Sequence, residues 1–493
     1  MKMARNKRQP AQGLPQGAAG KRRIHVNKLP IILPAAAAAL VLGIYTALNL
    51  APAAGAEQQV SLGQRHLEEM DYNSALLSFS QAIQVDPANT QAQLGLAQAY
   101  MGLGDYKAAQ NVVADMGSAA ETPEALKVKL NIALQEGDAG QAIEQVWNLI
   151  QATDEDEYYT QLEELLAEYT GQPHSVDLGE EHQAYVRDGV VYTQGRNTMG
   201  QLGVSQGLGQ GGEVAEDFVD AQFPGQAAKV YCIGQTTFVI DEDGALWAAG
   251  ENRWGQKGTG VQDLSLSVGW RQVANGGNAA SVAGAKGYTV VLKRDGTLWT
   301  MGYRNQDELT QAVGLPPIRE ICCADAAAYA LSVNGELYGG LYGAWNAGVT
   351  NELVDWVRVA TRVSRFYLDE FASPVWLDQQ DMLHAPDAHV PAFLPEEWMS
   401  APADISVARM TGPYEAVLLS TEEGELLAAS YYGSGSLEPV GEGGDVAAMY
   451  TIGESRSYAV IEYKDGSAQV WDPAAGRLWE LEDFLQDKEH IPY

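Results

Sequence analysis

A short turn that contains glycine recurs along the C-terminal part of the chain, each time between short apolar and aromatic segments. An acidic residue or Asn followed by Gly, with such flanks, is a strong local signal for a β-hairpin. The pairs are Asp188-Gly189, Asp243-Gly244, Asp295-Gly296, Asn334-Gly335, Glu423-Gly424 and Asp465-Gly466. One interval is about twice the usual one, and its midpoint holds the degenerate turn Gln380-Asp381-Met382-Leu383. Seven units of roughly 45 residues in an all-strand region predict a seven-bladed β-propeller.

The second half of the early units carries a longer pattern. Two segments resemble the WGxNxxGQLG signature of the regulator-of-chromosome-condensation repeat: Gly195-Arg196-Asn197-Thr198-Met199-Gly200-Gln201-Leu202-Gly203 and Gly250-Glu251-Asn252-Arg253-Trp254-Gly255-Gln256-Lys257-Gly258. The resemblance covers residues 178–482, is strong in units one to three, and is eroded in units four to seven. It implies an all-β propeller over that range. The nucleotide exchange and chromatin binding of the family's eukaryotic founder are not expected here, because a fold does not fix a function.

Residues 57–171 follow a helical period instead. Apolar and small residues lie on one face at spacings of three and four, as in Tyr72, Ala75, Phe79 and Ala82, and Asp86-Pro87 ends the segment. The string Met70-Asp71-Tyr72 returns about 34 positions later as Gly104-Asp105-Tyr106, and again as Gly137-Asp138. This period resembles the tetratricopeptide repeat, with a capping helix over 154–170.

The tetratricopeptide resemblance implies a groove, lined by the first helix of each repeat, that binds a peptide or a protein. The groove positions map to Val60, Gln64, Leu67, Leu94, Gln98 and Met101. The Lys and Asn clamp by which the chaperone-binding version of this fold holds a terminal carboxylate is not supplied at these positions. Capture of a carboxylate in this groove is therefore not expected.

The N-terminal segments point to a membrane. Residues 1–28 hold eight Lys or Arg and no acid, and the 22 residues Leu29–Leu50 are uncharged. That length spans a bilayer, and the basic flank predicts a cytoplasmic N-terminus. We expect an uncleaved, single-pass signal anchor in a bacterial envelope, with all later domains outside the cytoplasm. The alternative is secretion after cleavage following Ala56, because Ala54-Gly55-Ala56 fits a signal-peptidase site.

Charge and composition exclude several classes of protein. Acidic residues outnumber basic ones 64 to 31, for a formal net charge of −33, which argues against nucleic-acid binding. Three cysteines exclude a disulfide-dense scaffold, and the seven histidines form no metal-binding spacing. We expect buried thiols at Cys322 and Cys323, a structural role for His182, and no metal pair at His384 and His389. No catalytic residue, metal or cofactor is expected.

Aromatic side chains in the loops after the outer hairpins are the remaining candidates for binding partners. They are Trp254, Trp345, Tyr431 and Tyr432. With the groove residues they predict a non-enzymatic scaffold that presents two protein-interaction surfaces at the cell envelope. The alternative is a propeller that binds cell-wall glycan, and a third hypothesis places an enzyme site in the propeller channel.

Two expectations concern the end of the chain. The strands around Tyr458–Val460 and Val470–Trp471 are expected to pair near the strands of His182–Tyr192 and so to close the propeller, because unpaired blade edges promote aggregation. Residues 483–493 are expected to form a C-terminal tail.

Overall fold

The computed structural model describes residues 55–204, 214–259, 269–285, 287–302, 306–324, 327–341, 356–369, 372–385, 394–413, 415–433, 436–453 and 457–487. The chain divides into two compact units, Met1–Ala92 and Gln93–Tyr493. No helix within the described ranges combines the length and the apolar character that a membrane span requires. The expected anchor, Leu29–Leu50, lies outside these ranges.

The first unit contains the helix pair α2 (Ala56–Glu68) and α3 (Tyr72–Val85). Phe79 of α3 is fully buried, and a Cβ on Gly63 of α2 would stand only 2.7 Å from its ring. Glycine at this position therefore lets the two helices approach closely. Ala75 and Ala82 are buried with Phe79, so the apolar face predicted from the sequence forms the core of this pair.

The second unit begins with helices that continue the same pattern. They are the rest of α4 (Thr90–Gly102), α5 (Tyr106–Ala114), the short 3-10 helix η1 (Gly117–Glu121), α6 (Pro123–Glu136), α7 (Ala139–Thr153) and α8 (Asp156–Thr170). Ala97 and Ala109 are buried in one apolar cluster. Ile143, Leu162 and Leu166 are buried in a second cluster, which joins α6, α7 and α8.

A repeated turn accounts for the helical period. The carboxylates of Asp71, Asp105 and Asp138 precede α3, α5 and α7, and each accepts a hydrogen bond from the backbone amide three residues later, at 3.0 to 3.2 Å. An N-cap of this kind satisfies an amide that has no partner within the helix. The residue before each Asp adopts a left-handed conformation, and these residues are Met70, Gly104 and Gly137.

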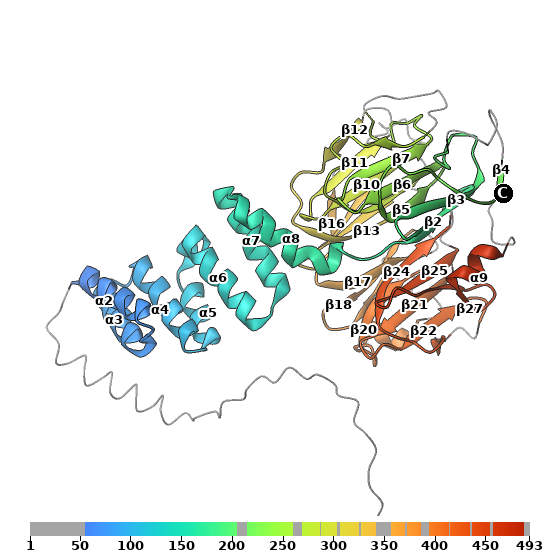
Figure 1. The fold of residues 1–493 in the computed structure, drawn as a ribbon. Coiled ribbons are helices and arrows are strands. Elements are labelled where there is room, and N and C mark those ends of the chain that lie inside the picture. Colours follow the sequence, from blue (N-terminus) through green and yellow to red (C-terminus); the bar gives the residue numbers. More distant parts are fainter. Residues whose placement is uncertain are drawn as a thin grey trace, which may run out of the picture. The chain divides into compact units, whose positions relative to one another are not determined.

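Seven antiparallel sheets follow (Figure 1). The first sheet contains β1 (Val176–Leu178), β2 (His182–Arg187), β3 (Val190–Arg196) and β4 (Val214–Asp220), and the second contains β5 (Ala227–Ile233), β6 (Thr236–Asp241), β7 (Leu246–Gly250) and β8 (Arg271–Gln272). The third sheet contains β9 (Ala279–Ala285), β10 (Tyr288–Lys293), β11 (Leu298–Gly302) and β12 (Gln306–Gln311), and the fourth contains β13 (Ile318–Ala324), β14 (Ala327–Ser332), β15 (Leu337–Leu341) and β16 (Val357–Ala360). Each consists of four strands in chain order.

The last three sheets complete the propeller. The fifth sheet contains β17 (Val363–Leu368), β18 (Pro374–Asp378) and β19 (Leu383–His384). The sixth contains β20 (Val407–Thr411), β21 (Ala416–Thr421), β22 (Leu426–Ser430) and β23 (Glu438–Pro439), and the seventh contains β24 (Val446–Ile452), β25 (Tyr458–Tyr463), β26 (Ala468–Asp472) and β27 (Arg477–Glu480). The innermost strands contact one another in the order β1, β5, β9, β13, β17, β20, β24 and back to β1. The seven-bladed propeller predicted from the hairpin period is confirmed.

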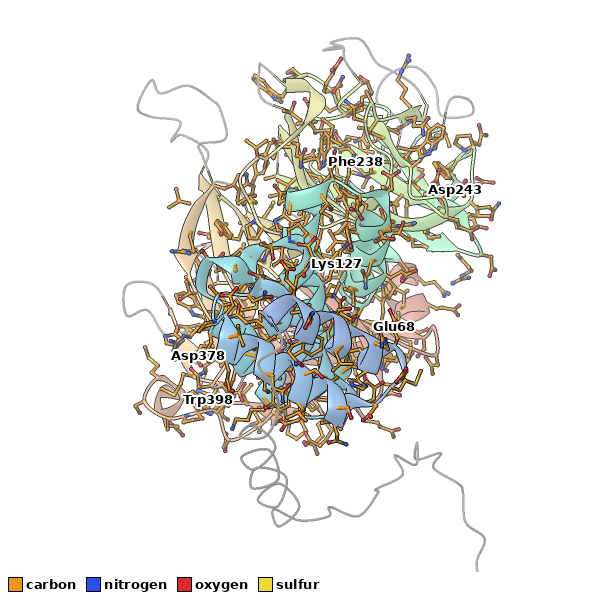
Figure 2. All side chains as sticks on the ribbon, turned by 90° about the vertical axis from the view of Figure 1, so that its left-hand side faces the viewer. Glu68, Lys127, Phe238, Asp243, Asp378 and Trp398 are labelled. Atoms are coloured by element: carbon orange, nitrogen blue, oxygen red, sulfur yellow. The ribbon has the colours of Figure 1, made fainter. Side chains whose placement is uncertain are left out.

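Every hairpin used for that prediction joins the second and third strands of a blade. Asp243 lies at the tip of such a hairpin, whereas Phe238 of β6 lies inside blade two (Figure 2). Among these hairpins, which the structure describes, only the Asp188-Gly189 turn has two residues that are both left-handed. In the third blade the loop is one residue longer, and the backbone amide of Gly296 donates to the carbonyl of Lys293 across it.

The propeller closes without sharing a strand between its first and last blades. β25 and β26 lie beside the first blade, but their ladder hydrogen bonds stay within blade seven. Val176 and Leu178 of β1 share an apolar cluster with Ile452 and with Phe484 of the C-terminal helix α9 (Leu481–Gln486). Side-chain packing, reinforced by an ion pair between Arg187 and Glu482 at 2.9 Å, therefore joins the ends of the ring.

Candidate interaction surfaces and the propeller channel

The polar residues of the repeat signature hold their own loops. Asn197 Oδ1 accepts the Leu202 amide at 2.9 Å, and Gln201 Oε1 accepts the Met199 amide at 2.9 Å. In the second blade, Asn252 and Gln256 make the same two contacts, with the amides of Lys257 and Trp254. These Asn and Gln side chains are therefore structural groups that shape the loop.

Two histidines singled out by the sequence also have structural partners. His182 is fully buried, and its Nε2 donates to Thr237 Oγ1 at 2.8 Å, while the Thr237 hydroxyl donates to the Gln201 carbonyl. Burial lowers the pKa of His182 to about 3, so the ring stays neutral. His384 contacts the Asp378 carboxylate at 2.9 Å, and His389 lies outside the described residues.

The predicted groove residues differ in exposure. In the first unit, Gln64 is exposed, Leu67 is half-buried and Val60 is buried, so Val60 belongs to the helix core and not to a groove surface. In the second unit, Gln98 is exposed, and Leu94 and Met101 are half-buried against the cluster around Ala97. The first helices of the first two repeats, α2 and α4, thus each offer an exposed Gln and partly buried apolar side chains.

The loop aromatics fall into three groups. Trp254 is half-buried in a signature loop of blade two, and Trp345 lies outside the described residues. Tyr431 and Tyr432 follow β22 and are 72% and 56% exposed. Their rings meet edge to face with centroids 6.0 Å apart. Among the predicted loop aromatics that the structure describes, this tyrosine pair offers the most exposed surface.

Helix α8 was predicted as a cap for the helical array, and it also packs on the propeller (Figure 1). Lys229 Nζ of β5 donates to the carbonyl of Thr170, the last residue of α8, at 3.0 Å. Asn278 Nδ2 donates to Glu163 at 2.6 Å, and the Arg319 guanidinium lies 5.4 Å from the Tyr169 ring centroid. A cation at the carbonyl end of a helix is favourable, because that end carries partial negative charge.

The innermost strands of all seven blades line a central cavity of about 1270 Å³. The linker after α8 enters it, and His174 stacks between Tyr231 and Tyr450 with centroid distances of 4.2 and 3.8 Å. His174 Nδ1 donates to the Val230 carbonyl at 2.7 Å. Loss of hydration inside the cavity is the main cause that lowers the pKa of His174 to about 3, and the charge of Lys229 acts in the same direction, although the ring retains some accessible surface.

The cavity also holds charged side chains that no sequence motif marks. Arg319, Glu320, Arg365 and Arg409 line it beside α8, and Asp177 lies on β1. Burial raises the pKa of Asp177 to about 8. The repeat period alone could not reveal this set, because equivalent positions in successive blades carry different residue types. The register of each inner strand was needed to align them.

Cys322 and Cys323, which were expected to be buried thiols, are half-buried on β13 and line the same cavity. Burial raises the pKa of Cys323 well above its usual value. The described parts of the chain hold no group of three or more His, Cys, Asp or Glu side chains arranged to bind a metal ion.

The chain thus combines an α-helical, tetratricopeptide-like region with a seven-bladed β-propeller. Comparison with known proteins gives a family model, Tetratricopeptide repeat, that matches residues 66–132. No curated protein matches the chain.

Similar solved structures include human WBSCR16, at 16% identity and a TM-score of 0.39, covering 63% of this chain and 80% of that one. A structure of Kap60 bound to yeast RCC1 (Prp20) gives 12% identity and a TM-score of 0.36, covering 60% of this chain and 69% of that one. Prp20p from Saccharomyces cerevisiae gives 13% and 0.37, covering 61% and 73%. The blade assignment rests on the strand pairing described above, and these similarities add nothing on function.

Proposed function

We propose that this protein is a non-enzymatic scaffold that presents two protein-interaction surfaces, one on the helical array and one on the propeller. The observation that carries the proposal is the match of residues 66–132 to the tetratricopeptide repeat. Repeat arrays of this kind offer an extended surface lined by the first helix of each repeat. The exposed Gln64 and Gln98 lie on such first helices, α2 and α4.

Introducing charge on these first helices tests the helical surface. Gln64→Arg and Gln98→Arg, combined in the full chain, should abolish capture of partners that bind the array. The matched control is Gln84→Arg with Asn111→Arg, which adds the same charge at exposed positions of the second helices α3 and α5. Quantitative mass spectrometry of co-purified proteins should show loss for the first pair alone. Equal recovery from both pairs would contradict a groove on the first helices.

The location proposed for the scaffold is the outer side of a bacterial cytoplasmic membrane. The support is the uncharged segment Leu29–Leu50 behind eight basic residues. With tags at each end, protease added to intact cells should remove the tag at Tyr493 and spare the tag at Met1. A protected C-terminal tag, or a protein recovered without membrane, would contradict the anchor.

Cell-wall glycan is the second candidate ligand, and the exposed Tyr431–Tyr432 pair favours it. Sugar rings stack on exposed aromatic side chains, and such side chains also anchor proteins. Tyr431→Ser with Tyr432→Ser should release the protein from isolated wall polymer in a sedimentation assay if glycan is the ligand. Unchanged sedimentation, with loss of a co-purified protein, would assign the tyrosine pair to the scaffold function.

A further inference from the structure

The short linker after α8 is hydrogen-bonded to three blades of the propeller. The Val230 amide of β5 donates to the His174 carbonyl at 3.0 Å, and His174 Nδ1 donates back to the Val230 carbonyl. The Ser175 amide donates to Glu462 Oε1 of β25 at 2.7 Å, and the Ser175 carbonyl accepts the Val186 amide of β2 at 2.7 Å. Two consecutive linker residues are therefore bonded to blades seven, one and two.

Side chains of blade seven reinforce this attachment. The Tyr450 ring of β24 stacks on His174, which stacks in turn on Tyr231 of blade two. The Tyr450 hydroxyl donates to the buried Glu462 carboxylate, and this orients Glu462 towards the Ser175 amide. Removing the carboxylate would leave a backbone amide and a hydroxyl without their acceptor, which is costly inside a protein.

The other end of the linker is fixed to blades two and three. Lys229 Nζ of β5 donates to the Thr170 carbonyl at the end of α8, at 3.0 Å, and to the Ala280 carbonyl of β9 at 2.5 Å. Four residues separate Thr170 from Ser175, and one of them is Pro173, whose ring restricts the backbone. A displacement of α8 is therefore transmitted to the contacts that the linker makes with blade seven.

These contacts cross the one place where the ring is closed without a shared strand. The ladder hydrogen bonds of β25 and β26 stay within blade seven, and His174 lines the central cavity, so the linker crosses the seam between blades one and seven on the channel side. We infer that α8 and residues 171–175 form a strap that holds this seam, so that α8 and the seam open together as one unit. Such coupling is reciprocal, and it needs no partner of the scaffold.

Hydrogen exchange of the full chain, followed by mass spectrometry, tests the strap. In the wild type, α8 should exchange faster than β14 of blade four, which would show that α8 opens without unfolding of the whole propeller. Glu462→Leu removes the acceptor of the Ser175 amide, although Glu462 lies 287 residues further along the chain. This variant should raise the exchange rate of α8 by at least about tenfold, because the seam and α8 open together.

Glu480→Leu is the matched control, because Glu480 is exposed on the outer strand β27 of the same blade, and it should leave the α8 rate unchanged. Glu462→Gln keeps an acceptor without the charge. It should raise the α8 rate above that of the wild type but less than Glu462→Leu does, and it decides the test if the leucine variant does not fold. An unchanged α8 rate in the deciding variant, or a wild-type α8 that exchanges no faster than β14, would overturn the strap.

The reverse perturbation starts from the α8 end. Lys229→Met removes the ammonium group that holds the Thr170 carbonyl, and it should raise the exchange rates of both α8 and β24. Lys293→Met is the control, because Lys293 stacks on Trp299 within blade three, and it should leave both rates unchanged. A faster α8 with an unchanged β24 in Lys229→Met would show that the helix opens alone, which contradicts the inference.

Discussion

At the residue scale, the blade hairpins show what replaces glycine where a left-handed backbone is needed. Gly466 has φ +88° at the turn of blade seven, and the equivalent residue of blade five is Asp381, with φ +58°. In both turns the amide of this residue donates to the carbonyl three residues earlier. The left-handed region costs most residues roughly 1 to 2 kcal/mol, but Asp tolerates it better than others.

This comparison predicts opposite outcomes for two substitutions. Gly466→Ala should lower the free energy of unfolding by about 1 kcal/mol, and because a Cβ there meets open space, the cost is purely conformational. Asp381→Gly should leave the free energy of unfolding unchanged or slightly raised, because relief of strain is offset by the freer unfolded chain. Urea denaturation measures both. A loss in Asp381→Gly as large as that in Gly466→Ala would contradict the alignment of the two turns.

The histidine that stacks between two tyrosines in the channel predicts a dependence of stability on pH. His174 has a pKa of about 3 in the folded chain and about 6.5 when exposed, so below pH 6.5 the unfolded chain binds a proton that the folded chain does not. Stability should therefore fall as the pH drops from 6.5 towards 3. His174→Phe keeps an aromatic ring between Tyr231 and Tyr450 and removes this proton.

Chemical denaturation between pH 4 and pH 6 measures the effect. The free energy of unfolding of His174→Phe should change with pH by about 1.4 kcal/mol per unit less than that of the wild type. His182, which also has a pKa of about 3, contributes equally to both proteins. Parallel pH dependences for the two proteins would show that His174 is protonated in the folded state.

The sequence reveals the importance of some residues and not of others. Asp71, Asp105 and Asp138 recur in the sequence about every 34 positions, and the structure gives the reason, because each caps the helix that follows it. Glu320 and Arg409 did not stand out, because a channel position constrains where a side chain points and not which residue it is. Their alignment depends on a one-residue shift in each inner strand, and a shift of this kind leaves no mark in the sequence.

At the scale of elements, the C-terminal helix α9 packs against both the first and the last blade. Phe484 is 1% exposed and packs with Val176 of β1 and Val460 of β25. The sequence predicts a tail over residues 483–493, and this prediction misses α9 because a six-residue helix has too few turns to show an apolar period.

Phe484→Ala should lower the free energy of unfolding by about 3 kcal/mol, since it leaves a cavity at the closure of the ring. Gln486→Ala, on the exposed side of the same helix, should change the free energy of unfolding by less than about 0.5 kcal/mol. Thermal unfolding monitored by circular dichroism compares the two. Equal midpoints for both variants would exclude a role of α9 in closure.

Helix α8 shows where element prediction reaches its limit. Its existence followed from the spacing of Leu162 and Leu166, but its contact with the propeller did not. That contact depends on Lys229 and Asn278, which lie more than fifty residues further along the chain. Local periodicity carries no information on contacts at such a separation, so the packing of α8 on the propeller could not be predicted from the sequence.

At the scale of the whole molecule, the seven-blade ring predicts cooperative loss of the propeller. Removing residues 446–493 deletes blade seven and α9, and it uncovers the apolar faces of blades one and six. The truncated chain should be insoluble, because these faces and their strand edges would associate. Removing only residues 488–493 is the control and should leave solubility unchanged. A soluble, β-rich protein after the larger truncation would contradict the closed ring of seven blades.

The central claim is that the helical array and the propeller each bind partners, and site-resolved crosslinking in intact cells tests it most directly. Lys107, Lys127 and Lys129 lie on α5 and α6, whereas Lys464 lies at a propeller hairpin, so an amine-reactive reagent can assign each partner to one half of the wild-type chain. We predict that crosslinked peptides from the helical lysines and from Lys464 lead to distinct, reproducible proteins. A chain that yields no reproducible partner from either half would contradict the scaffold.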